Sequence, residues 1–190
     1  MELDVVTTSK RSIMKPWARS FLTIFFFLFY FTIQAQKTYV LIPKKTEKLN
    51  KAVVTSLPPN LKALAALYSA MGGTNCLELE CNLTAALGLG KQGSEAQKNL
   101  IRKYFPDDKA ANLVILQDCY LAPSSASSFS NFTALSFMVK RDSIIVNYQL
   151  NVYDHGNTKI IKGPDIYVFK NQVYQNKKRV LYAWTDKKKA

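Results

Sequence analysis

A glycine-rich segment is the part of this sequence whose spacing most suggests chemistry. Gly88–Gly93 matches the pattern GxGxxG, which holds a pyrophosphate when a strand leads into it and a helix follows. Here a helix-forming segment leads in, so we interpret the pattern as a loop between two helices. Gly90, Lys91, Gly93 and Ser94 form a candidate anion-binding loop, because a basic side chain and backbone amides lie just ahead of a predicted helix.

The three cysteines are the second candidate for chemistry. Because the hydrophobic leader of the chain predicts export, we expect one disulfide and one free thiol. On one helix Cys76 and Cys81 would be separated by about 7.5 Å of rise and about 140° of rotation, so a bond between them requires the helix to begin after Cys81. A helix that begins at Cys76 instead makes Cys119 the partner, and in an up-down-up arrangement Cys81 lies nearer to it. We therefore expect a Cys81–Cys119 disulfide, with three buried free thiols as the alternative.

Histidine and carboxylate side chains show no catalytic spacing. His155 is the one histidine, which excludes sites that need two or three, and it lies in a predicted turn without a GxSxG elbow elsewhere. Glu78 and Glu80 would diverge on a helix, whereas Asp107 and Asp108 are placed to cap one. We therefore assign no catalytic residue and no metal ligand, and we expect no cofactor.

The chain begins with a hydrophobic leader. Phe21–Ile33 has thirteen uncharged residues, too few for a transmembrane helix of about 20 residues but typical of a signal-peptide core. Basic residues precede it and Ala35 supplies the small residue before a cut. We expect residues 1–35 to be a signal-peptide region, with translation from Met14 and cleavage after Ala35; an uncleaved anchor is the alternative. The Gln-Ala-Gln end resembles signal peptides of Bacteroidetes, which implies a bacterial protein in the periplasm or outside the cell.

The composition predicts a basic globular protein. It is 48% hydrophobic and 12% aromatic, which excludes a disordered chain. The chain has 26 Lys and Arg against 13 Asp and Glu, a formal charge of +13 that favours anionic partners. Export argues against nucleic acid, so we expect an anionic envelope component, a glycan or an envelope protein. No transmembrane span is expected after cleavage of the leader.

The first half of the mature chain, about 57–121, predicts helices. Asn60 is placed to cap the first, whose apolar residues recur at i, i+3, i+4 and i+7. Ser94, with Gln three residues later, begins a capping box for a later helix. Either Asp107 or Asp108 would cap the last helix.

The second half, 132–184, predicts strands. It follows a Ser-rich connector, 123–131, and precedes a basic tail, 185–190. The clearest strand is Ile144–Val152, where apolar and polar residues alternate, as expected for one buried face. Further strands are predicted at Tyr39–Ile42, Ile166–Phe169, Val173–Tyr174 and Arg179–Trp184.

Helices followed by strands predict an α+β fold. We expect N-terminal helices packed on a C-terminal antiparallel meander of about four to five strands, in a single exported domain, 36–190. The leading hypothesis for function is a binding or interaction module without catalytic activity, acting at the cell envelope or outside the cell. The alternative is a secreted hydrolase that acts on cell-wall or other glycan substrates.

Overall fold

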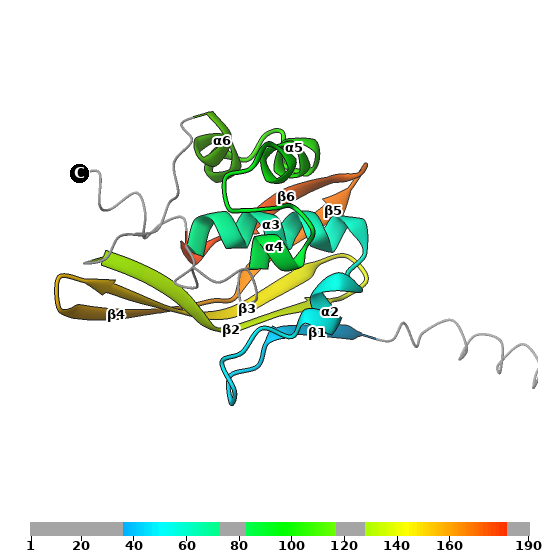
Figure 1. The fold of residues 1–190 in the computed structure, drawn as a ribbon. Coiled ribbons are helices and arrows are strands. Elements are labelled where there is room, and N and C mark those ends of the chain that lie inside the picture. Colours follow the sequence, from blue (N-terminus) through cyan, green and yellow to red (C-terminus); the bar gives the residue numbers. More distant parts are fainter. Residues whose placement is uncertain (1–35, 73–82, 117–127, 182–190) are drawn as a thin grey trace, which may run out of the picture. The chain divides into compact units, whose positions relative to one another are not determined.

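The computed structural model describes residues 36–72, 83–116 and 128–181, apart from the side chains of 114–116. These residues form helices and one antiparallel sheet, so the α+β class is confirmed (Figure 1). The leader, the cleavage after Ala35 and the basic tail lie outside the described residues and stay predictions. The helices are α2 Lys51–Thr55, α3 Pro59–Gly72, α4 Leu83–Ala86, α5 Glu95–Tyr104 and α6 Lys109–Leu116.

Two of the predicted helix starts are confirmed. At α5, Ser94 Oγ accepts a hydrogen bond from Gln97 N at 3.2 Å. At α6, Asp108 Oδ1 accepts one from Ala111 N at 3.1 Å, which selects Asp108 over Asp107 as the cap. Both side chains satisfy amides that the first helical turn leaves without a partner.

The predicted start of α3 is wrong by a small shift along the chain. The helix begins at Pro59, so Asn60 lies inside its first turn and does not cap it. The carbonyl of Pro58 accepts from Lys62 N at 2.9 Å. Proline suits the first helical position because its φ is already helical and its missing N–H would have no partner there.

The sheet has six strands among the described residues, one from the start of the domain and five from its C-terminal half, where about four to five are predicted. Its strand order is β1-β2-β3-β5-β6. Strand β4 is not in this order and pairs with another part of β3. All pairings are antiparallel. The strands are β1 Lys37–Ile42, β2 Ser128–Val139, β3 Ile144–Asp154, β4 Asn157–Lys162, β5 Asp165–Lys170 and β6 Val173–Lys178. Because β1 comes from the start of the domain and pairs with β2, the sheet is not purely C-terminal.

Two further boundaries differ from the prediction. Residues 128–131, predicted as connector, already belong to β2 and pair with Asn151–Asp154 of β3. Ser130 is compatible with a buried strand because its hydroxyl donates to the carbonyl of Gly72. Arg179, predicted to begin a strand, lies just beyond β6, because its side chain turns inward to bind Asp108.

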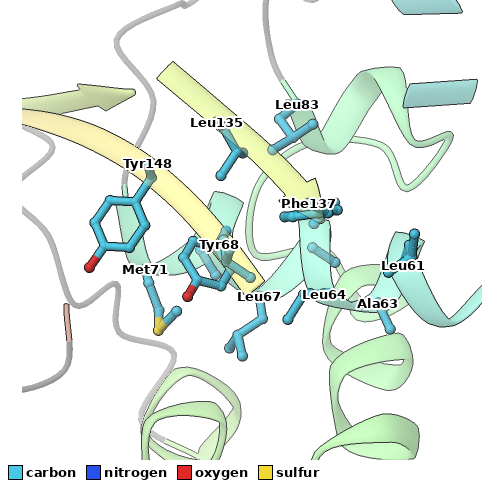
Figure 2. Close-up of a cluster of buried hydrophobic side chains, with 14 of the residues drawn as sticks. Leu61, Ala63, Leu64, Leu67, Tyr68, Met71, Leu83, Leu135, Phe137 and Tyr148 are labelled. Carbon is cyan, nitrogen blue, oxygen red and sulfur yellow. The ribbon is translucent and has the colours of Figure 1, made fainter. Parts of the chain in front are cut away.

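Helix α3 is the centre of the core. It lies between the sheet on one side and α5 and α6 on the other, which explains why it is apolar nearly all round (Figure 1). Tyr68 and Met71 are fully buried, and Figure 2 shows them beside Phe137 and Tyr148 of the sheet. Each such side chain contributes about 1.5–3 kcal/mol by leaving water.

A buried polar junction joins α3, α4 and α5. Gln97 is 1% exposed, and its Nε2 donates to the carbonyl of Ala66 at 2.9 Å and to Thr84 Oγ1 at 3.3 Å. Thr84 Oγ1 in turn lies 2.6 Å from Ser69 Oγ. Because buried polar groups are costly without partners, these bonds fix how the three helices meet.

The alternation predicted for Ile144–Val152 is confirmed in β3. In β3 every second residue from Ile144 to Val152 is buried, whereas Asn147, Gln149 and Asn151 are only partly buried. The buried residues face α3, since successive side chains of a strand point to opposite faces. Among the described residues, α3 to α6 all lie on that one side of the sheet (Figure 1). Within the part of the chain that the structure describes, the other face of the sheet therefore has no helical layer.

Candidate functional site: the open face of the sheet

We call the sheet surface opposite α3 the open face. Its residues follow from the strand alternation and the pairing register. Strand β3 lies at its centre, flanked by β2 on one side and by β4 on the other. Around β3 the open face includes Val40, Phe129, Asn131, Ala134, Ser136, Met138, Ile145, Asn147, Gln149, Asn151, Tyr153, Ile160 and Lys162.

A pocket of about 320 Å³ lies on the open face. Small residues of β2, Ala134 and Ser136, leave room above the sheet, and the β3 amides Asn147 and Gln149 border that room. Its size is within the usual range for small-ligand sites. The lining residues are Val40, Ile42, Lys44, Ala134, Leu135, Ser136, Asn147, Tyr148, Gln149, Lys162 and Gly163.

The pocket lies where the sheet divides. Strand β3 pairs with β5 up to Val146 and with β4 from Gln149 onward. The chain crosses between these partners at Gly163, whose N–H donates to the carbonyl of Tyr148 at 3.1 Å. A Cβ at Gly163 would lie 2.6 Å from Tyr148 Cε1 and 3.0 Å from the carbonyl oxygen of Val146. Glycine is therefore required for the close approach that forms this edge of the pocket.

The pocket is basic. Lys162 projects from the end of β4, and Lys44 comes from the segment after β1. None of the outward positions of the six described strands carries Asp or Glu. Among the described residues that line the pocket, none is Asp or Glu, and the amide and hydroxyl groups beside the two lysines can donate and accept hydrogen bonds. Such a lining suits a polar ligand with negative charge.

An aromatic pair lies on the same face, beyond the pocket. Phe129 of β2 and Tyr153 of β3 are cross-strand partners, and their ring centroids are 4.4 Å apart with planes tilted by 32°. Between this pair and the pocket, Asn131 faces Asn151 across the same two strands. Ile160 of β4, 52% exposed, flanks them. Amide and aromatic groups therefore continue along β3 from the pocket.

Beneath the pocket, on the helical side, lies a buried carboxylate. Asp165 is fully buried and accepts hydrogen bonds from the hydroxyl of Tyr68, from Tyr148 OH at 3.2 Å and from Val180 N at 2.7 Å. Burial raises the pKa of Asp165, and these donors oppose that rise. Burial also raises the pKa of Tyr167 to about 12. These groups are satisfied by one another, so we assign the cluster a structural role.

A second buried ionic group fixes the chain after β6. Arg179 Nη1 and Nη2 donate to the two carboxylate oxygens of Asp108 at 2.7 and 2.5 Å, and the side chains are 3% and 5% exposed. Arg179 Nε also donates to Tyr167 OH at 3.0 Å. This two-pronged pair ties the chain after β6 to the start of α6.

The predicted anion-binding loop lies between α4 and α5, away from the open face. Two of its amides have protein partners: Gly93 N donates to Gln97 Oε1 of α5 at 2.7 Å and Ser94 N to the carbonyl of Lys91 at 3.2 Å. Ser94 Oγ donates to the carbonyl of Leu89 at 2.5 Å. Gly90 has a positive φ of 76°, and Lys91 is exposed. Anion binding by this loop stays a prediction.

The other singled-out residues contribute no described site. Cys81 and Cys119 lie outside the described residues, so their disulfide stays a prediction. His155 is an exposed turn residue as expected, with its side chain 76% exposed. Ser128 and Asp154 both contact its Nδ1, at 3.3 and 3.1 Å, whereas a catalytic triad uses the two ring nitrogens separately.

Metal ligands and membrane-spanning helices are both absent from the described part of the chain. No three His, Cys, Asp or Glu side chains in the described ranges come together as metal ligands would. Within the same ranges, no helix has the length and apolar character needed to cross a bilayer.

Sequence reasoning missed the open-face pocket, although one signal for it was present. The polar half of the Ile144–Val152 alternation consists of the amides Asn147, Gln149 and Asn151, which can bind ligands as well as face water. The pocket also needs β1, the end of β4 and Gly163 to come together. No local pattern in the sequence indicates that meeting.

No known family model, curated protein or solved structure matches this chain. Its function must therefore be inferred from its own residues and their arrangement.

Proposed function

We propose that this protein is an exported binding module without catalytic activity and that its open face holds an anionic ligand. The observation that carries the proposal is the pocket lining, which combines Lys44 and Lys162 with the amides of Asn147 and Gln149 and, among the described residues, includes no carboxylate. Lysines attract a negative group, and the amides can hold neighbouring hydroxyls. The leader supports a place in the periplasm or outside the cell.

Binding is favoured over glycan hydrolysis by the placement of the carboxylates. Most glycoside hydrolases need two carboxyl groups on either side of the bond that is cut. The described residues that line the pocket include none. Asp108 and Asp165 are buried on the helical side and hold Arg179 and the tyrosine cluster. The alternative, a secreted hydrolase acting on cell-wall or other glycans, therefore has no support in this pocket.

The test is an NMR titration of the exported protein, purified after expression of the full chain and labelled with nitrogen-15. Galacturonate serves as a small anionic probe and galactose as its neutral match. We expect galacturonate, and not galactose, to shift the amide signals of Asn147, Gln149 and Gly163. These three residues line the pocket.

Matched variants decide whether the pocket lysine is responsible. Lys162→Gln should weaken galacturonate binding, whereas Lys170→Gln should not, because Lys170 is an exposed lysine of β5 outside the pocket. Both variants lose one charge, so a general charge effect would change both equally. Equal weakening, or shifts confined to another surface, would refute the proposal.

A further inference from the structure

We infer that the ligand of the open face is an extended acidic glycan that lies along β3, from the pocket to the Phe129–Tyr153 pair. This inference rests on the proposed function and specifies its ligand. Four outward residues of β3 mark the path, Asn147, Gln149, Asn151 and Tyr153. Their Cα atoms span about 20 Å at the usual rise of a strand, which is room for several sugar units.

The groups along this path suit a hydroxyl-rich chain. Amide side chains both donate and accept hydrogen bonds, as sugar hydroxyls do. The Oδ1 atoms of Asn131 and Asn151 are enclosed and have no hydrogen-bond partner among the described residues. The middle of the path thus has hydrogen-bonding capacity that the protein itself does not use.

The far end of the path offers a surface for stacking. Phe129 and Tyr153 are both partly buried and lie against each other on the open face. Aromatic rings combine an apolar face with a rigid position, which suits the apolar face of a sugar ring. Ile160, exposed beside them, extends this apolar area. A ligand that reached only the pocket would leave this end unused.

Charge determines the choice of an acidic glycan. Lys44 and Lys162 lie at the pocket end, and the outward positions of the described strands carry no carboxylate to repel an anion. A lipid surface is less suitable, because the outward side chains of β3 from Asn147 to Asn151 are all amides and the exposed apolar residues Val40 and Ile160 lie only on the flanking strands. The row of amides along β3 and the aromatic pair at its end together suit a linear acidic polysaccharide.

The experiment is calorimetry with oligogalacturonates of two and six units, with neutral maltohexaose as a control. We expect the hexamer to bind about tenfold or more tightly than the dimer, because only the hexamer reaches the aromatic pair. Tyr153→Ala should weaken hexamer binding about three- to tenfold and leave dimer binding unchanged. Tyr153→Phe keeps the ring and should keep the affinity. Asn151→Ala, which removes an amide from the middle of the path, should also weaken only the hexamer.

The outcomes separate this inference from the proposed function. If the dimer binds in the pocket and the hexamer binds no better, the extended path is wrong and the pocket stands. If Tyr153→Ala and Asn151→Ala, confirmed as folded by circular dichroism, both leave hexamer binding unchanged, the path is again wrong. If neither oligomer binds, and polyphosphate or anionic vesicles bind instead, the glycan assignment is overturned. If no anion shifts the pocket signals, both proposals fail.

Discussion

Replacing Arg179 by methionine should lower the free energy of unfolding by about 3–5 kcal/mol, the usual cost of breaking a buried ion pair from one side. The guanidinium is 3% exposed and donates to both oxygens of Asp108, at 2.7 and 2.5 Å, as well as to Tyr167 OH at 3.0 Å. Methionine fills part of the same volume but offers no donor. Asp108 would keep its bond from Ala111 N and lose the charge that compensates its own.

The magnitude can be checked by urea unfolding followed by circular dichroism. Arg179→Met and Asp108→Asn are measured alone and together. Because each single change leaves one buried partner without the other, the double variant should lose at least about 2 kcal/mol less than the two single losses added. Arg179→Lys should fall between wild type and Arg179→Met, since lysine keeps the charge but cannot form the two-pronged contact.

Two results would refute this reasoning. A loss below about 1 kcal/mol for Arg179→Met would mean that the pair behaves as an exposed ion pair. Additive losses in the double variant would mean that the two side chains do not interact in solution. In either case the Arg179–Asp108 pair would not hold the chain after β6 to α6, contrary to what the distances between the two side chains indicate. Unchanged slopes of the unfolding free energy against urea are needed for the comparison.

Three further predictions concern the sheet, its buried carboxylate and the end of α3. Val146→Asp should shift the urea midpoint strongly downward by burying a charge, whereas Asn147→Asp on the open face should shift it little; equal shifts would mean that the faces are misassigned. Burial raises the pKa of Asp165 above 3.8, so the folded state holds its proton more tightly and stability should fall as pH rises above 3.8. In Asp165→Asn the urea midpoint should therefore fall less as the pH rises over this range. An unchanged dependence of the midpoint on pH would contradict a raised pKa of Asp165. Gly72→Ala would place a Cβ 2.0 Å from Phe132 Cε2 and should cost about 1–3 kcal/mol in thermal unfolding, a loss that Phe132→Leu should reduce if the ring is its cause.

The parts of the fold that depend on neighbours in sequence are predictable. Ser94 caps α5 because its partner is three residues away, and the buried face of β3 follows from a simple alternation. The prediction of Asn60 as a cap is wrong because two residue types compete for a helix start, and Pro59 takes the first helical position. Such local competition changes a boundary without changing the element.

The parts that depend on distant residues are not predictable in the same way. The apolar run at Tyr39–Ile42 predicts a strand, but nothing near it indicates that it pairs with a strand almost a hundred residues later. Asp165 lies in a turn-forming sequence and Arg179 in a basic run, and neither context indicates burial, because their partners lie far along the chain. The candidate site shares this difficulty, since β1, β3 and Gly163 meet there only in the folded protein.

The division of the sheet has a consequence for solubility. Within the described residues β1, β4 and β6 each pair with a single strand, so the sheet ends in three edges rather than two. An unpaired edge can recruit strands from other molecules, and lysines discourage this by repulsion. Strand β4 carries Lys159 and Lys162, β6 ends in two lysines, and Asn50 N covers part of β1 by donating to the carbonyl of Leu41 at 2.8 Å.

Part of the charge of +13 would then keep molecules apart rather than hold a ligand. Acetylation of the edge lysines would be expected to promote aggregation of folded protein even where the pocket is unoccupied.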